Sequence, residues 1–445
     1  VEKASNGHRH HNGGAPSPPG DGGADPPRSR GYYYLTPEAA DAIPKFKYAG
    51  SDLSPIYKHV LSPLAQFLVD GFTPRTVAPN AITLSGLALM FAAYCAVWYH
   101  CPNYDEGARE EEGGGTGGSS TPSVPRWIFA FNCAAMLAYQ TLDNMDGKQA
   151  RRTGSSSPLG LLFDHGCDAV NSAFGSGNWM AAMAVSTSSD PLAAWALVFM
   201  PMAAFYVTTW EEYYTGEMVL PSFNGPTEGL LMGAALSMTS AVLGPAYWRG
   251  TDWYDVAIAP VATYLLPPSV ADGLMPEGGI RNCDLVALAS VLGFVVAFFP
   301  RIYENCRRYG ASTLAGLFPF AVLCGAPLVV GRADPDLFVR NPRTSLHLFS
   351  GLFAEMATQL MLDHMTLLPF RALRPVLFPL AALATARAAG AAPGGDEADA
   401  LLLAYAVGVW VYLAMKVSVV IHEICDALGI WCFDIVTPRE KGSGG

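Results

Sequence analysis

Charged residues are scarce in this chain: Asp, Glu, Lys and Arg make up only 15% of its 445 residues, whereas soluble domains carry about 25%. The few basic residues form no patch of the kind that nucleic acids bind, and the net charge is −11. The nine cysteines form no CxxC pair and have no regular spacing, which argues against a disulfide framework or a zinc site. These absences point towards a membrane protein.

Long apolar runs fill most of the chain, and 51% of its residues are hydrophobic. The runs are close to the roughly 20 residues that a helix needs to cross a bilayer, and they are continuous, unlike the alternating strands of a β-barrel. The sequence therefore predicts an all-α integral membrane protein with about ten transmembrane helices. The expected spans are residues 80–100, 126–144, 158–188, 190–210, 227–248, 284–300, 310–331, 344–362, 375–392 and 400–424.

The composition divides the chain into four parts. Residues 1–30 are rich in Gly, Pro and polar residues and are expected to form a disordered tail. Residues 31–76 mix charged residues with apolar ones at helical spacing, which indicates amphipathic helices at the membrane interface. The membrane domain follows at 77–437, with a long Pro- and Gly-containing loop expected at 249–282, and residues 438–445 form a C-terminal tail.

Basic residues before the first span indicate the side of the membrane on which the N-terminus lies. Lys45, Lys47, Lys58 and Arg75 precede this span, and the loop after it is acidic, so we expect a cytosolic N-terminus. Ten spans would return the C-terminus to the cytosol and would place the turn near Lys148 there as well.

Four aspartates lie near the turn of a predicted helical hairpin at residues 126–188. Asp143 and Asp146 are one turn apart in the first helix, and Asp164 and Asp168 share a face of the second. Antiparallel packing would make all four carboxylates face one another. A solvated helix end would explain Asp143 alone. It does not explain Asp164 and Asp168, which an uncharged run follows, because an ionised Asp within the hydrocarbon costs about 2.5–3.5 kcal/mol.

Cations are therefore expected among these carboxylates. Arg151 and Arg152 could neutralise two charges, but they cannot fill a cage of oxygen ligands. All-oxygen sites suit Mg²⁺ or Mn²⁺, which keep positions open for substrate phosphates. Two such ions between four carboxylates is an arrangement that enzymes use for phosphoryl displacement. The predicted metal ligands are Asp143, Asp146, Asp164 and Asp168.

The same hairpin resembles a known family. It fits, without a mismatch, the signature D-x2-D-G-x2-A-R-x8-G-x3-D-x3-D of the CDP-alcohol phosphotransferases. The stretches "DGKQARRT", "FDHGCD", "APNAIT" and "WEEYYTG" resemble the eukaryotic choline/ethanolamine phosphotransferase branch, and "LPSFNGPTEGL" is similar to its plant and algal members. The residues that match the signature are Asp143, Asp146, Gly147, Ala150, Arg151, Gly160, Asp164 and Asp168.

The resemblance implies a ten-span enzyme of the endoplasmic reticulum or Golgi, commonly a homodimer, with its active site facing the cytosol. Such an enzyme transfers phosphoethanolamine or phosphocholine from CDP-ethanolamine or CDP-choline to the hydroxyl of diacylglycerol and releases CMP. Ethanolamine and choline enzymes share the motifs quoted above, so the head group stays open at this point.

The residue types within the motif suggest individual roles. The small residues Gly147 and Ala150 would let a nucleotide lie against the first helix, and Gly160 leaves room one turn before the third aspartate. The planar guanidinium of Arg151 suits phosphate oxygens. These residues are expected to bind the CDP-alcohol together with Asn80, whose amide would either cap the first span or reach the nucleotide.

The acceptor hydroxyl needs a base. Asp168 is the usual candidate in the family, but a metal-bound carboxylate is a weak base. His165 lies one helical turn away, and because an imidazole titrates near pH 6.5, we expect the two residues to act jointly. Alternatively, His165 only hydrogen-bonds to a backbone carbonyl.

Two further residues are candidates for binding the substrate. Glu228 opens the fifth span, where it would complement the helix dipole, attract the ammonium of the substrate or assist His165. Tyr214 belongs either to an aromatic belt at the membrane interface or to the contacts of that ammonium.

Other classes of protein also place carboxylates in membrane spans. A cation or proton transporter does so, but it does not need the small residues and the arginine of the motif. Inositol or glycerophosphate-type synthases share the motif but are typically much shorter. A catalytically dead scaffold would be expected to lack an aspartate, and none is missing.

Two opposite charges lie deep within the last predicted spans. Glu355 is near the middle of the eighth span and Lys416 is well inside the tenth. A lone charge at such depth costs several kcal/mol. We therefore expect the two side chains to pair rather than to reach separately for the membrane surface.

Overall fold

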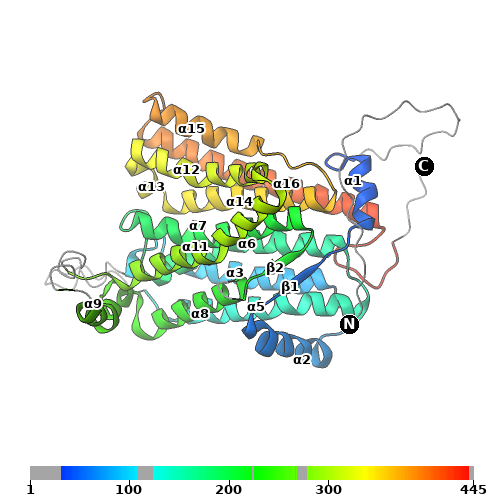
Figure 1. The fold of residues 1–445 in the computed structure, drawn as a ribbon, viewed down its shortest axis with the longest axis horizontal. Coiled ribbons are helices and arrows are strands. Elements are labelled where there is room, and N and C mark those ends of the chain that lie inside the picture. The colour runs from blue at the N-terminus through cyan, green and yellow to red at the C-terminus, as the bar shows by residue number, and fades with distance from the viewer. Residues whose placement is uncertain (1–31, 108–123, 223–224, 266, 268–277, 440–445) are drawn as a thin grey trace.

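The fold is a bundle of long helices that lie side by side, with the connections at its two ends (Figure 1). The predicted tail at 1–30 and most of that at 438–445 lie outside the part that is described. The structure is a computed structural model, and it describes residues 32–107, 124–222, 225–265, 267 and 278–439.

A helix occupies each of the ten predicted spans. These helices are α3 (Pro79–His100), α5 (Trp127–Thr153), α6 (Pro158–Ala182), α7 (Pro191–Thr215), α8 (Pro226–Leu243), α11 (Asn282–Tyr309), α12 (Phe318–Ala333), α14 (Pro342–Met365), α15 (Phe378–Ala388) and α16 (Gly395–Leu428). Five are long and apolar enough to cross a membrane: α3, α7, α11, α16, and α12 taken with the preceding η5 (Ala311–Leu317). The mostly helical, membrane-spanning character is confirmed, and the count of ten crossings stays a prediction.

Proline and glycine set the ends of several helices. Pro158, Pro191 and Pro226 lie in the first turns of α6, α7 and α8, where a missing backbone N–H costs nothing. Gly154 and Gly216 end α5 and α7 in the left-handed conformation, with φ of 70° and 74°. The connection between α5 and α6 is therefore short enough to form the predicted hairpin.

Two three-residue strands depart from the all-α prediction. β1 (Gly50–Asp52) pairs in parallel with β2 (Met218–Leu220), and Gly50 lies opposite Met218. The pair ties the N-terminal segment to the connection between α7 and α8. Strands this short have too few residues to show an alternating pattern, and their pairing depends on a contact between distant parts of the chain.

The loop expected at 249–282 is also partly helical. The connection holds η3 (Pro245–Arg249), η4 (Tyr254–Ile258) and α9 (Ala259–Leu265) before α11 begins. The prolines and glycines that suggested a loop lie mostly after α9. Two other short helices, α13 (Pro335–Arg340) and η6 (Pro375–Leu377), precede α14 and α15.

The segment 31–76 contains two short helices rather than one long one. They are α1 (Pro37–Ala42), which η1 (Ile43–Lys45) extends, and α2 (Ser62–Phe72), which follows η2 (Tyr57–Leu61). In α2, Phe67 and Phe72 are exposed while Ala65 and Val69 are buried. An interfacial helix inserts exposed apolar side chains such as these into the edge of the bilayer, and the placement of α2 there remains a prediction.

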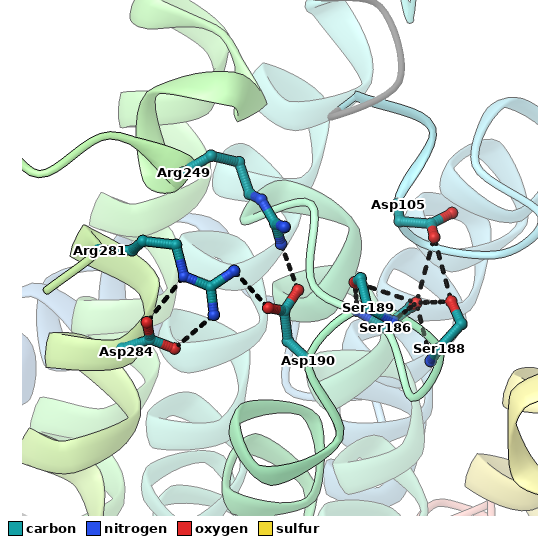
Figure 2. Close-up of polar contacts among 8 residues, drawn as sticks. All are labelled: Asp105, Ser186, Ser188, Ser189, Asp190, Arg249, Arg281 and Asp284. Atoms are coloured by element: carbon teal, nitrogen blue, oxygen red, sulfur yellow. Dashed lines mark hydrogen bonds and ion pairs between the residues drawn. The ribbon is translucent and has the colours of Figure 1, made fainter. Parts of the chain in front are cut away.

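A buried carboxylate joins three elements at the end of the bundle opposite the hairpin turn (Figure 2). Asp190, just before α7, pairs with Arg249 of η3 and with Arg281 before α11, whose Nη1 is 2.5 Å from Oδ1. Burial alone would raise the pKa of Asp190, but hydrogen bonds from Ser189 and Arg281 and the charges of both arginines outweigh it, so the pKa is lowered. The two arginines thus stabilise the ionised carboxylate and hold α7 and α11 together.

The predicted pair of charges in the last spans is confirmed. Lys416 Nζ in α16 lies 2.6 Å from Glu355 Oε1 in α14, and both residues are 5% exposed. Neither side chain reaches the surface.

Breaking this pair should destabilise the protein. Glu355→Gln or Lys416→Met leaves one buried charge without its partner, which costs about 3–5 kcal/mol, whereas removal of both charges is nearly neutral. Each single variant should melt at a lower temperature in detergent, and the double variant should recover most of the loss. Additive losses in the double variant would contradict a direct coupling of the two residues.

Candidate active site

The hairpin of α5 and α6 brings the motif residues together. Gly154 ends α5, and Ser157 starts α6 by accepting a hydrogen bond from the backbone N–H of Gly160 at 3.2 Å. The turn between the helices is therefore tight. It holds the second half of α5 against the first half of α6, where the four aspartates lie.

Three of the four carboxylates form a group that could hold a metal ion. Ligand oxygens of Asp143, Asp164 and Asp168 all lie within 4.8 Å of one another. The fourth, Asp146, is buried, accepts a hydrogen bond from Thr83 Oγ1 at 2.5 Å, and lies close enough to Asp164 for the two carboxylates to interact. Asp168 accepts a 2.5 Å hydrogen bond from the hydroxyl of Tyr139.

The donor set fits a hard divalent cation. Oδ1 of Asp143 and Oδ1 of Asp164 are buried and have no hydrogen-bond partner among the described residues. A buried, unpartnered carboxylate oxygen is costly, and several at one place repel one another. Mg²⁺ or Mn²⁺ takes oxygen ligands of this kind, and would lie between Asp143, Asp164 and Asp168 with Asp146 beside them.

Arg151 and Arg152, which follow the first pair of aspartates, have different surroundings. Arg151 is exposed, makes no hydrogen bond or ion pair within the described residues, and lies over Gly147, where an added Cβ would be 3.4 Å from its Nη1. Arg152 donates to the backbone carbonyls of Val69 and Thr73 and thereby holds α2 against α5. Arg151 is thus available to a phosphate and Arg152 is not.

Asn80 does not cap α3, contrary to one of the two sequence interpretations. The N-cap position is Ala78, and Asn80 lies inside the first turn. Its Nδ2 donates to the backbone carbonyl of Cys432 at 2.9 Å, and an added Cβ on Gly160 would lie 3.7 Å from its Oδ1. Asn80 and Gly160 therefore face one another at the first turn of α6.

His165 makes the backbone contact that was the alternative to a catalytic role. Its Nδ1 lies 3.0 Å from the carbonyl oxygen of Leu161, and its Nε2 lies 3.3 Å from the sulfur of Met218 in β2. The ring thus presents Nε2 to β2 and keeps Nδ1 on its own helix. These two contacts fix the orientation of the imidazole ring.

Glu228 and Tyr214, the two further candidates for substrate binding, contact other parts of the chain. Glu228 caps α8 through the backbone N–H of Gly225 at 3.1 Å and accepts a 2.5 Å hydrogen bond from Ser54. Tyr214 packs between Trp210 and Tyr309. Among the described residues neither contacts a motif aspartate or His165.

Sequence reasoning missed the two hydroxyls that hold the carboxylates. Thr83 belongs to the quoted "APNAIT" stretch, and Tyr139 lies one helical turn before Asp143 on α5. Both are buried. Helical spacing was a signal for Tyr139, but nothing in the sequence shows that α3 presents Thr83 to α5.

An apolar cavity of about 240 Å³ lies on the other side of α6. Gly166 and Cys167, which stand between His165 and Asp168 in the sequence, line its wall, and so does the paired Lys416. The remaining lining residues come from α3, α6, α14 and α16: Leu84, Leu87, Leu159, Leu162, Phe163, Val170, Ala354, Thr358, Leu362, Leu413, Val417, Val420 and Ile421.

Comparison with known proteins agrees with the hairpin motif. The profile described as CDP-alcohol phosphatidyltransferase matches residues 76–264. Choline/ethanolaminephosphotransferase 1 of Arabidopsis thaliana is 32% identical over 414 residues, which cover 90% of this chain and 98% of that protein. Choline/ethanolaminephosphotransferase 2 of Arabidopsis thaliana is 30% identical with the same coverage, and ethanolaminephosphotransferase 1 of Mus musculus is 27% identical over 93% of this chain and 98% of its own length.

These similarities cover the membrane region nearly end to end, and the matched profile contains the whole α5–α6 hairpin. The chain therefore belongs to the CDP-alcohol phosphotransferase family.

Replacing a motif carboxylate should abolish metal binding without loss of stability. Asp143→Asn and Asp164→Asn each remove a negative charge from a repelling group, so the melting temperature without metal should stay the same or rise. Mn²⁺ or Mg²⁺ at 100 times its Kd should stabilise the unmodified protein by about 2.7 kcal/mol and should leave these variants unchanged. Asp190→Asn is the control: it should lower the melting temperature but keep the response to metal.

Arg151 and Arg152 form a matched pair for a second test. Arg151→Ala should weaken CDP-alcohol binding about 10- to 100-fold, the value of a hydrogen bond to a charged group, at an unchanged melting temperature. Arg152→Ala should do the reverse because it releases α2. Equal effects of the two substitutions on affinity would show that Arg151 has no special access to the phosphates.

Proposed function

We propose that this protein transfers phosphoethanolamine, phosphocholine or both from the CDP-alcohol to diacylglycerol, giving phosphatidylethanolamine or phosphatidylcholine and CMP. One observation carries the proposal: a group of facing carboxylates with unpartnered oxygens lies beside a free arginine in a membrane bundle. Most of the chain is similar to proteins that are named for these two head groups.

The donor would lie across the mouth of the hairpin. The guanidinium of Arg151 suits the diphosphate. The small side chains of Gly147 and Ala150 leave room for the nucleotide against α5. Asn80, which faces Gly160, can offer its amide oxygen to the cytosine. Divalent ions held by the aspartates would offset the charge of the diphosphate and of the departing CMP.

The acceptor would come from the membrane side. Helix α6 separates the apolar cavity from the carboxylates. Gly166 and Cys167 of this helix line the cavity, whereas their neighbours His165 and Asp168 do not. A diacylglycerol has two hydrocarbon chains and one free hydroxyl. We propose that one of its chains occupies this cavity, so that the hydroxyl reaches α6 from the bilayer.

The reaction then needs one proton transfer and one displacement. The hydroxyl oxygen of diacylglycerol bonds to the phosphorus that carries the aminoalcohol, and the bond from this phosphorus to the CMP oxygen breaks. CMP leaves with the electron pair. The hydroxyl proton passes to His165 Nε2 or to Asp168, the two bases within one helical turn of each other.

The cellular setting is part of the same proposal. An enzyme of this kind acts in the endoplasmic reticulum or Golgi, with the hairpin turn on the cytosolic side where CDP-alcohols are dissolved. The basic residues before α3 support this orientation. We further propose ten crossings and a homodimer, as the family resemblance implies.

The purified protein tests the function directly. With diacylglycerol and Mn²⁺ or Mg²⁺, it should convert labelled CDP-ethanolamine or CDP-choline to the corresponding lipid. The Asp164→Asn variant should transfer no label from CDP-choline to lipid. Inositol or glycerol 3-phosphate with CDP-diacylglycerol serves as the alternative donor and acceptor pair. Product from that pair alone would assign the chain to the other synthase branch, and metal-coupled ion flux without lipid product would favour a transporter.

His165 can be separated from the residues that bind substrate. If it accepts the hydroxyl proton, His165→Ala should lower the turnover rate by about 10²–10⁴-fold with little change in CDP-alcohol affinity. A change in affinity alone would mean that the ring only packs between α6 and β2.

A further inference from the structure

A second buried carboxylate near the hairpin has no role in the scheme above. Glu212, in the last turn of α7, is 1% exposed. It forms no side-chain hydrogen bond with the described residues. Its recorded partner is His364 of α14, whose Nε2 is 3.8 Å from Oε1, which is beyond hydrogen-bond distance.

Aromatic rings surround this carboxylate's neighbour. The ring of His364 meets the edge of Phe46 at 5.4 Å and lies 6.2 Å from Tyr213. Tyr213 is itself fixed, because its hydroxyl donates to the carbonyl of Leu368 at 2.9 Å. Proteins bind ammonium groups with aromatic rings and with carboxylates, and both kinds of group lie next to His364.

Tyr48 connects Glu212 with the motif carboxylates. Burial raises the pKa of the Tyr48 phenol well above its usual value, and the charges of Glu212 and Asp164 and the phenol of Tyr57 raise it further. Tyr48 therefore lies within electrostatic reach of both carboxylates. Its hydroxyl folds back over Gly50, where an added Cβ would overlap it.

The strand pair places this cluster next to the reacting groups. Gly50 of β1 pairs with Met218 of β2, and the Met218 sulfur contacts His165 Nε2. On α7, Phe205 lies two turns before Glu212 and its ring is 6.1 Å from that of His165. The helix that carries Glu212 thus contacts the catalytic hairpin at His165, and β2, which follows that helix, contacts the same ring.

We propose that Glu212, with Tyr48 and His364, binds the ammonium of the aminoalcohol carried by the CDP-alcohol. This assignment rests on the proposed function and adds the residue that selects a cationic head group. The metal-binding aspartates cannot do this, because they are needed at the diphosphate. Glu212 lies on the next helix, α7, and does not belong to the metal-binding group.

A carboxylate at this place would not distinguish the two amines. It attracts a primary and a quaternary ammonium alike, whereas selection between them would need several hydrogen-bond acceptors placed around the nitrogen. We therefore expect both CDP-ethanolamine and CDP-choline to depend on Glu212.

Competition binding separates head-group recognition from nucleotide recognition. The full chain in detergent with Mn²⁺ is titrated with CDP-ethanolamine, CDP-choline and CMP, which lacks the aminoalcohol. Glu212→Gln should weaken both CDP-alcohols about 10- to 100-fold, as expected for the loss of a charge-assisted contact, and should leave CMP unchanged. The matched control is Glu211→Gln: the neighbouring carboxylate pairs instead with Arg301, whose Nε is 2.6 Å away, so the ratio of affinities should not move.

Each outcome decides the proposal. An equal loss for CMP and the CDP-alcohols would show that Glu212 only supports the fold, and an unchanged ratio would overturn the site while the transfer activity of the unmodified protein stands. If the unmodified protein transfers neither head group, the proposed function fails first. If Glu212→Gln does not fold, the test uses the unmodified protein and compares CDP-ethanolamine with its uncharged N-acetyl derivative. CDP-ethanolamine must bind at least 10-fold more tightly, and equal binding rejects a cation site.

Discussion

Repulsion among like charges is the constraint around which this bundle is built. Four carboxylates meet between α5 and α6, and oxygens of three of them lie within 4.8 Å of one another. Such a group opposes folding unless the surrounding helices compel it. Thr83 from α3 and Tyr139 from α5 each donate a hydrogen bond to one carboxylate, and together with the tight turn at Gly154 they keep the charges in place for a cation.

The supporting contacts come from parts of the chain that the motif does not include. Arg152 holds α2 beneath α5, Asn80 holds the residues after α16 near the first turn of α6, and β2 supports His165. The N-terminal segment, the strand pair and the C-terminal residues therefore converge on one hairpin. The eight-position motif would be incomplete without these distant partners.

The sequence predicted the helices and the metal-binding group because both depend on local spacing. Apolar runs located the helix in each of the ten predicted spans, and aspartates one turn apart predicted the facing carboxylates. The ion pair of Glu355 and Lys416 was also predictable, since two opposite charges in apolar runs have few other partners. The strand pair, the contact of Asn80 with Cys432 and the isolation of Glu212 depend on how distant segments meet, and no local pattern carries that information.

Ion pairs join α7 to α11 near both ends of the bundle. Asp190, just before α7, pairs with Arg281, just before α11, and Glu211 near the end of α7 pairs with Arg301 of α11. Two helices that are fastened at both ends form a stiff frame and cannot splay apart. A water-soluble nucleotide and a lipid therefore have to reach the hairpin past helices other than this pair.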